Sequence, residues 1–205
     1  MIQIFKTWGV PKYIKVDNGR PFGDPQLDLI PPMALWLIGL GIKVIWNRPA
    51  TPQDNAKVER MQGVMAKWTE YKKCEDTFAL QTRLWREADF YNYHFPIKRH
   101  RNKKRIELFP TMRHTGKNWN PNDFKLKRVL IFVKKGNWER KVSSTGQVSL
   151  YGQLYYVGVA YKHQIVSLKL EPTKNVWSIF DNKGGLIRQR PAPFSIQSIW
   201  NIDLS

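Results

Sequence analysis

The sequence predicts a mixed α/β domain followed by a small all-β barrel. Three observations predict this fold class. The first half alternates strand-like and helix-like apolar runs, the second half changes to a two-residue apolar period, and Pro and Asn cluster between them at residues 118–123 (NWNPND). We therefore place an α/β domain at residues 1–115 and a barrel domain at residues 116–205.

Two strands and an apolar helix are expected early in the first domain. Residues 12–17 (KYIKVD) alternate and are β-branched, which indicates a strand that ends at Asp17. Residues 33–40 are predicted to form a short apolar helix that ends at Gly41, and residues 42–46 are predicted to form a buried strand.

Two longer helices follow these strands. Thr51 is a good N-cap and lies three residues before Asp54, close to the spacing of a capping box, so a helix is predicted to begin there. Its apolar residues have i, i+3, i+4, i+7 spacing: Met61, Val64, Met65 and Trp68. A second helix is predicted over residues 77–93.

Short strands separated by turn signals are expected in the second domain. They are predicted at residues 129–133, 138–142, 147–157, 165–170 and 176–187. Turn residues such as Tyr151-Gly152 and Gly184-Gly185 separate them, and short strands at this spacing are typical of a small barrel.

The charge of the chain points to a polyanionic partner. Its 205 residues include 34 Lys and Arg against 16 Asp and Glu, a formal net charge of +18. Nucleic acid is the leading partner, because each neutralised phosphate releases a counterion. An anionic membrane surface and a charge that serves solubility alone are the alternatives.

No membrane span, signal peptide or zinc module is predicted. The most apolar run, residues 33–46, is shorter than the roughly 20 residues that a helix needs to cross a bilayer. The N-terminus has no apolar signal region, and the single cysteine, Cys74, cannot form an intrachain disulfide or anchor a zinc finger. We expect a cytoplasmic protein without membrane contact.

Two carboxylates stand where a strand and a helix could bring them together. Asp17 ends the predicted strand before Asn18-Gly19, and Glu59 lies early in the predicted helix. Mg²⁺ prefers such oxygen ligands, and paired ions stabilise attacking and leaving oxygens in phosphoryl transfer. Turn chemistry at Asp17 and the helix dipole at Glu59 explain the same residues without a metal, so the residues alone leave both interpretations open.

A family resemblance rests on these two segments. Residues 9–19 (GVPKYIKVDNG) resemble the second-aspartate motif of DDE-type transposases and retroviral integrases, and residues 40–60 are similar to the segment that supplies the glutamate of that family. Residues 140–157 and 177–181 resemble the small β-barrel that follows the core in such enzymes. The resemblance implies a partial ribonuclease-H-like integrase core followed by a small SH3-like barrel.

The resemblance also implies a function. It makes Asp17 and Glu59 catalytic ligands of Mg²⁺ or Mn²⁺ in phosphodiester strand transfer during DNA transposition or integration, carried out by a homo-oligomer. The first aspartate of the family lies upstream of the motif at Asp17, and residues 1–16 contain no Asp or Glu. We therefore expect that the chain lacks the first strands of the core, that its first domain alone is poorly soluble, and that it shows weak or no catalysis by itself.

DNA contacts are predicted in two basic clusters. Residues 98–105 (KRHRNKKR) are expected to track phosphates, with a solvated linker as the alternative. The candidate contacts are Asn55, Lys98, Arg99, Arg101, Lys103, Lys104, Arg105, Lys125, Lys127, Arg128, Lys134, Lys135, Arg140 and Lys141. Trp138 lies among the second cluster, where it either stacks on bases or belongs to the barrel core.

Two other functions remain open from the residues. The chain could be a non-enzymatic DNA-binding remnant of a transposase, which the missing acid favours. It could also be an RNA-binding barrel protein, which fits the charge but leaves both acidic motifs unexplained.

Overall fold

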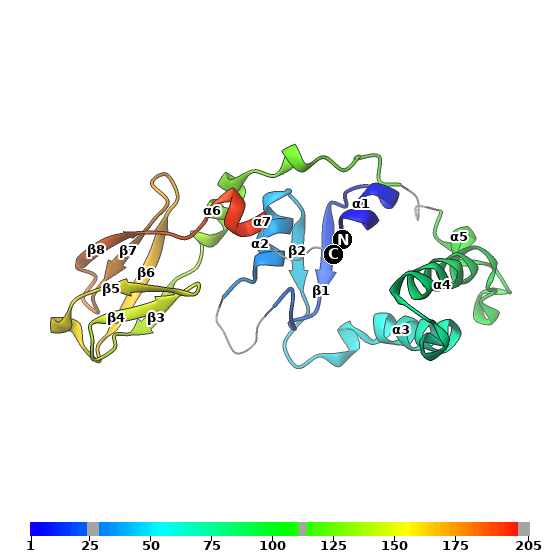
Figure 1. The fold of residues 1–205 in the computed structure, drawn as a ribbon, viewed down its shortest axis with the longest axis horizontal. Coiled ribbons are helices and arrows are strands. Elements are labelled where there is room, and N and C mark those ends of the chain that lie inside the picture. The colour runs from blue at the N-terminus through cyan, green and yellow to red at the C-terminus, as the bar shows by residue number, and fades with distance from the viewer. Residues whose placement is uncertain (24–28, 111–113, 201–205) are drawn as a thin grey trace. The chain divides into compact units, whose positions relative to one another are not determined.

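The computed structural model describes residues 1–23, 29–110 and 114–200 and shows a mixed α/β protein (Figure 1). Its residues cluster into two compact units. Unit 1 comprises Met1–Lys6, Val10–Trp46 and Asn118–Ser205, and unit 2 comprises Thr7–Gly9 and Asn47–Lys117. The predicted domains at 1–115 and 116–205 cut the chain once, whereas these units alternate along it.

Unit 1 contains the two strands expected near the N-terminus. Helix α1 (Ile2–Trp8) precedes strand β1 (Tyr13–Val16), and helix α2 (Pro32–Gly39) precedes strand β2 (Lys43–Trp46). The two strands pair in parallel, with Tyr13 opposite Lys43 and Val16 opposite Trp46. A helical crossover joins them, as parallel neighbours require.

Helix α2 is buried over most of its length, and its tryptophan is the centre of an aromatic cluster. Trp36 is fully buried and stacks on Phe5 with ring centroids 5.9 Å apart. Trp119 and Trp200 pack on the same indole at 5.7 and 5.9 Å. Since Trp200 ends helix α7 (Ile196–Trp200), this cluster ties both ends of the sequence into one core.

Residues 129–133, predicted as a strand, instead form part of helix α6 (Leu126–Val133), so that prediction is wrong. Val129, Leu130 and Val133 are buried at i, i+1 and i+4, which is the apolar face of a helix. A five-residue apolar run does not distinguish a strand from a buried helix by periodicity, and here packing against α2 decides for the helix.

The other predicted strands are present, but buried and exposed side chains alternate regularly only in some of them: residues 165–171 alternate, whereas the three consecutive residues 177–179 are all buried. An antiparallel sheet has the order β3-β6-β7-β8, and β4 and β5 form a separate hairpin. The bounds are β3 (Trp138–Lys141), β4 (Gln147–Leu150), β5 (Gln153–Tyr156), β6 (Ile165–Glu171), β7 (Val176–Phe180) and β8 (Leu186–Pro191). Within the described residues these strands do not close into a barrel.

A second aromatic cluster fills the space between the sheet and the hairpin. Trp177 of β7 is fully buried and meets Trp138 edge-on with ring centroids 5.3 Å apart. Tyr151 stacks on Trp177 at 6.1 Å and meets Phe194 at 5.0 Å. Trp138 is 4% exposed, so it belongs to the core and is not a stacking surface for bases.

The β4–β5 turn shows packing overriding backbone preference. Its two loop residues, Tyr151 and Gly152, have φ of 51° and 72°, as a type I′ hairpin requires. Gly suits this conformation, but a tyrosine there is unfavourable. The tyrosine ring is retained in the Trp177 cluster, which offsets that cost.

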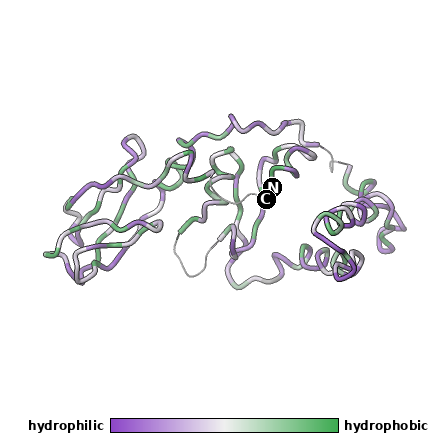
Figure 2. Tube along the Cα trace, viewed as in Figure 1, coloured by the Kyte–Doolittle hydropathy of each residue, from purple (hydrophilic) through white to green (hydrophobic). Residues whose placement is uncertain are grey.

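Unit 2 is helical and has a thin core. Its elements are η1 (Pro52–Asp54), α3 (Ala56–Thr69), η2 (Tyr71–Lys73), α4 (Thr77–Asp89), the π-turn η3 (Phe90–His94), η4 (Lys98–His100) and α5 (Arg105–Leu108). Every buried hydrophobic residue in the described chain lies in unit 1. The helices of unit 2 are mainly hydrophilic (Figure 2), and they meet through the half-buried Trp68, whose ring lies 5.0 Å from that of Phe95.

Candidate nucleic-acid interface and acidic residues

Asp17 lies at the carboxyl end of the parallel strand pair. The register places Val16 opposite Trp46, so the ends of β1 and β2 meet at one edge, and Asp17 follows directly with an exposed side chain. A tight turn comes next, in which the Gly19 carbonyl accepts hydrogen bonds from the backbone N–H groups of Phe22 and Gly23 at 3.1 and 2.8 Å. A Cβ on Gly23 would lie 2.3 Å from the Asn18 carbonyl oxygen, so this turn excludes any side chain there.

Glu59 lies in the first turn of α3, which begins later than predicted. The expected capping box does not form, because Asp54 accepts hydrogen bonds from the backbone N and the Nε of Arg48, both at 3.2 Å, and from Nη2 at 2.9 Å. The hydroxyl of Thr51 donates instead to the Pro49 carbonyl. The Asn55 carbonyl accepts from the backbone N–H of Glu59 at 3.0 Å, so Asn55 is the N-cap residue, although its side chain caps nothing.

The two acids do not complete a metal site within the part of the chain that is described. Asp17 belongs to unit 1 and Glu59 to unit 2, and both side chains are exposed. Their oxygens have the right chemistry for Mg²⁺. However, no group of three or more His, Cys, Asp and Glu side chains comes together among the described residues. The donor set is too small to derive a metal-dependent step, and the ligand assignment of both acids stays a prediction.

The predicted basic run is a folded loop. Ile97 and Lys103 form an antiparallel bridge, with the Ile97 backbone N–H donating to the Lys103 carbonyl at 3.0 Å. The Ile97 carbonyl accepts from the N–H groups of His100 and Asn102 at 2.9 and 3.2 Å. We call residues 97–104 the basic loop. Arg101 and Asn102 hold left-handed φ values of 55° and 60°, so the loop has a defined backbone shape.

The cations of the basic loop project into solvent without acidic partners. Its five Lys and Arg side chains are exposed, and none forms an ion pair with another described residue. They are Lys98, Arg99, Arg101, Lys103 and Lys104. A preordered set of unpaired cations has no internal ion pair to break before it contacts phosphates, which distinguishes it from the paired cations elsewhere in unit 2.

Arg105, also predicted to contact DNA, anchors the basic loop instead. Its guanidinium carbon lies 3.3 Å from the centroid of the Tyr91 ring, and Nη1 donates to the Tyr91 carbonyl at 2.9 Å. The side chain is half-buried. A planar guanidinium combines stacking with a directed hydrogen bond, which an ammonium cannot reproduce.

The substitution Arg105→Lys should therefore destabilise unit 2 by about 1–2 kcal/mol while the charge is unchanged. Urea unfolding followed by circular dichroism measures the loss. The matched variant Arg99→Lys, in the exposed part of the loop, should unfold like the unsubstituted chain. Equal stability of the two variants would show that Arg105 does not anchor the loop.

The second basic cluster surrounds α6 and the start of β3 in unit 1. The Arg128 side chain is held by hydrogen bonds within the fold: its Nη1 donates to the carbonyls of Gly39 at 2.9 Å and Asp123 at 2.7 Å. It thereby satisfies a carbonyl at the end of α2. Arg140 donates to the neighbouring Glu139 carbonyl. The other members are exposed: Lys125, Lys127, Lys134, Lys135 and Lys141.

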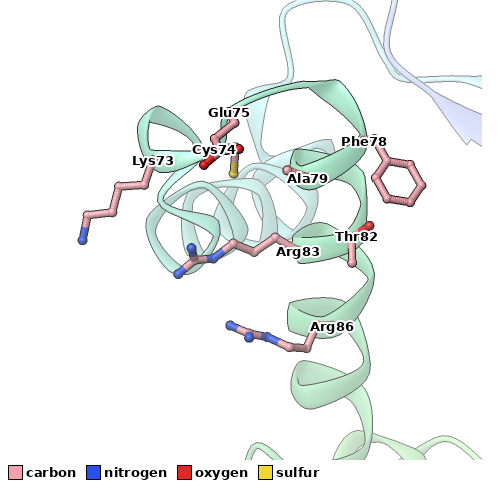
Figure 3. A pocket seen from close by; sticks show the side chains of 8 residues that line it. All are labelled: Lys73, Cys74, Glu75, Phe78, Ala79, Thr82, Arg83 and Arg86. Atoms are coloured by element: carbon pink, nitrogen blue, oxygen red, sulfur yellow. The ribbon is translucent and has the colours of Figure 1, made fainter.

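A cavity of about 430 Å³ lies beside the α3–α4 connection, but its cations are neutralised (Figure 3). Glu70 accepts from Lys73 at 2.7 Å and from Arg83 at 2.9 Å, and Arg86 is paired with Glu87 at 2.8 Å. The half-buried thiol of Cys74 lies among these residues. Because its charges are balanced, this cavity is a poorer phosphate site than the basic loop.

Glu70 makes the stability of unit 2 depend on acid pH. It ends α3 with a left-handed φ of 47°, and the hydrogen bond and charge of Lys73, followed by Arg83, lower its pKa below the usual 4.5. A lowered carboxyl pKa stabilises the folded state above the unfolded pKa, and that contribution disappears as the pH falls through the folded pKa.

We expect the urea midpoint of unit 2 to fall as the pH drops below 4.5, and Glu70→Gln to remove part of this dependence. Glu75→Gln, which changes a nearby exposed carboxylate outside any ion pair of the described chain, is the control and should keep the full dependence. An identical pH profile for Glu70→Gln and the unsubstituted chain would contradict the expectation.

Two aromatic residues, Trp46 at the end of β2 and Phe132 in α6, were not singled out from the sequence. Both are half-buried and line a cavity next to the Asp17 turn. The two residues are 86 positions apart, so no local sequence pattern predicts the contact between their rings. The contact forms because α6 packs beside the end of β2.

No model of a known protein family matches the chain. Of the helices in the described ranges, none has the length and apolar character needed to cross a membrane.

Proposed function

We propose that the chain is the DNA-handling part of a DDE-type transposase or integrase, with Asp17 and Glu59 as two of its acidic ligands. The observation that carries this proposal is the parallel pairing of β1 and β2. It puts an exposed aspartate at the carboxyl edge of a parallel pair, and the chain leaves that same edge from β2 to begin the helix with Glu59. Ligand sites of α/β sheets lie at this edge.

The proposal extends to the fold and the assembly. Strands β1 and β2 with helix α2 would belong to a ribonuclease-H-like core, and the β3-β6-β7-β8 sheet with the β4–β5 hairpin would be an SH3-like module. The active form would be a homo-oligomer on paired DNA ends. Mg²⁺ would supply charge neutralisation at the phosphate when bound.

DNA binding is the activity that the geometry supports best. The basic loop supplies five exposed cations on a fixed backbone, and unit 1 adds five exposed lysines around α6 and β3. The formal net charge of +18 adds long-range attraction for a polyanion. None of these features reads a base sequence, so the expected binding is sequence-tolerant and strongly salt-dependent.

The binding test is fluorescence anisotropy of a short labelled DNA duplex, titrated with the chain between about 50 and 200 mM salt. We expect a linear fall of log affinity with log salt. Duplex RNA of the same sequence is the comparison, because it carries the same phosphate charge on an A-form helix of different shape. Binding that is absent at low salt, or confined to RNA, would refute the DNA function.

Catalysis is tested separately from binding. Because no third acid joins Asp17 and Glu59 among the described residues, metal-dependent joining of a 3′-hydroxyl DNA end should be weak or absent with the chain alone. Joining should depend on Glu59 in a protein in which a further aspartate completes the site. In that completed protein Glu59→Ala should lower joining by at least about 100-fold without weakening DNA binding. Undiminished joining by Glu59→Ala would show that Glu59 is not a ligand. A completed protein that binds DNA and joins no ends would leave the second candidate, a non-enzymatic DNA-binding protein.

A further inference from the structure

We propose that the cavity beside the Asp17 turn receives one unpaired base of DNA, an inference that rests on the proposed function. The cavity has a volume of about 360 Å³ and lies wholly within unit 1. That size is within the range of small-molecule sites, about 300–1,000 Å³. Its walls come from the turn after β1, residues 29–31 before α2, the end of β2, and α6 with the residues that follow it.

Two aromatic rings form part of the apolar wall, together with Leu29, Ile30 and Pro31. The Trp46 and Phe132 rings lie 6.3 Å apart, centroid to centroid, at an interplanar angle of 36°. The indole is held in place because its Nε1 donates to the Phe22 carbonyl at 2.9 Å. Rings that are partly exposed and fixed in orientation offer faces on which a planar base can stack.

A cation stands at the same cavity. The Nζ atom of Lys135 lies 5.8 Å from the centroid of the Phe132 ring, and Lys134 beside it is also exposed. Neither lysine forms an ion pair with a described residue. A nucleotide has a flat apolar base and an anionic phosphate, so this combination of ring and ammonium matches both of its parts.

Two glycines of the cavity wall pack closely against their neighbours. A Cβ on Gly23 would lie 2.3 Å from the carbonyl oxygen of Asn18, the residue after Asp17, so the cavity adjoins the turn that carries the candidate acid. A Cβ on Gly136 would lie 2.4 Å from the buried Trp138 ring. A side chain at either position would therefore disturb the wall.

Two occupants would fit an apolar cavity of this kind: a DNA base, or an apolar side chain from a second copy of the chain. The charge of the protein favours the DNA base. Where no DNA lies between the copies, a second copy would bring another formal charge of +18 towards these exposed lysines, which is repulsive. A DNA strand brings phosphates and bases together. Enzymes that act on a DNA base often rotate it out of the helix and hold it between aromatic or apolar side chains. The free-energy cost of this rotation is lowest for a base that is already unpaired.

The experiment compares two labelled duplexes of the same sequence, one fully paired and one with a single unpaired adenine. The complete chain should bind the second about tenfold more tightly. A third duplex, with an abasic site in place of the unpaired adenine, keeps the backbone distortion and lacks the base, so it should lose the preference.

Variants assign the preference to the cavity. Phe132→Leu removes a stacking face and should abolish the preference for the unpaired adenine. Lys135→Gln, at an exposed side chain, should reduce that preference about threefold without affecting the fold. The matched control is Tyr156→Leu, another exposed aromatic of unit 1, whose ring lies 5.6 Å from the Arg188 guanidinium but lines no part of this cavity. Its preference should be unchanged.

The outcomes separate this inference from the proposed function. If the chain binds all three duplexes equally, or if Lys135→Gln and Tyr156→Leu behave alike, the base pocket is wrong while DNA binding stands. If the chain binds none of the duplexes, the proposed function itself fails.

Discussion

Replacing four cations of the basic loop with glutamine should lower the affinity for duplex DNA about 100-fold near physiological salt. The four are Lys98, Arg99, Arg101 and Lys103. Each is exposed and lies outside the ion pairs of the described residues, so each is free to displace a counterion from DNA. The slope of log affinity against log salt should become shallower by about 3–4, since each phosphate contact contributes about 0.9.

The slope discriminates better than the affinity itself. A general loss of structure would weaken binding, but it would not change the slope by the number of charges removed. Anisotropy titrations at several salt concentrations measure both quantities, and circular dichroism checks that the fold is retained.

Paired cations of the same unit provide the control. Lys73→Gln with Arg86→Gln removes two charges whose ammonium and guanidinium groups already contact Glu70 and Glu87. This double variant should change the salt slope by less than about 1. If it weakened binding as much per charge as the loop substitutions, the net charge of the chain, and not the loop, would be the interface.

Trp177→Ala should destabilise unit 1 by about 3–5 kcal/mol, the largest stability effect that we expect in the chain. The indole is fully buried in β7 and contacts the rings of Trp138, Tyr151 and Phe194. Removing it leaves a cavity that the sheet and the hairpin share, and a rigid pair of β-elements cannot collapse to fill it. Urea unfolding followed by tryptophan fluorescence measures the loss.

Two further variants identify the cause of that loss. Trp177→Phe should cost only about 1–2 kcal/mol, because a phenyl ring keeps most of the buried aromatic volume of the indole. Trp85→Ala, at a tryptophan that is 54% exposed on α4, should change stability by no more than about 0.5 kcal/mol. A Trp177→Ala variant as stable as Trp85→Ala would show that this cluster is not the core of unit 1.

The stability of the two units should differ, because their cores differ. Unit 1 has the Trp36 and Trp177 clusters, whereas the described part of unit 2 has no buried hydrophobic side chain. The burial of apolar area is the main favourable term in folding. Bound DNA would neutralise the basic loop and stabilise unit 2 by mass action.

Local patterns in the sequence determined most of the strands and helices. The strand before Asp17, the apolar helix at residues 32–39 and the short β-strands after residue 137 follow from alternation, helical spacing and turn residues acting over a few positions. The failures have equally local causes. The run at residues 129–133 was too short for its period to show a helix, and Asp54 bonded to Arg48 instead of capping α3.

Only the tertiary structure decided which charged and aromatic residues are available for binding. The sequence treats Arg105 like Arg101 and Arg128 like Lys127, but Arg105 stacks on Tyr91 and Arg128 bonds to carbonyls, while Arg101 and Lys127 face solvent. The sequence likewise does not distinguish Trp138, which is buried in the core, from Trp46, which lines a cavity. Composition and periodicity depend on neighbours along the chain. Ion pairing, stacking and burial depend on residues brought together from distant positions, and these contacts exist only once the chain has folded.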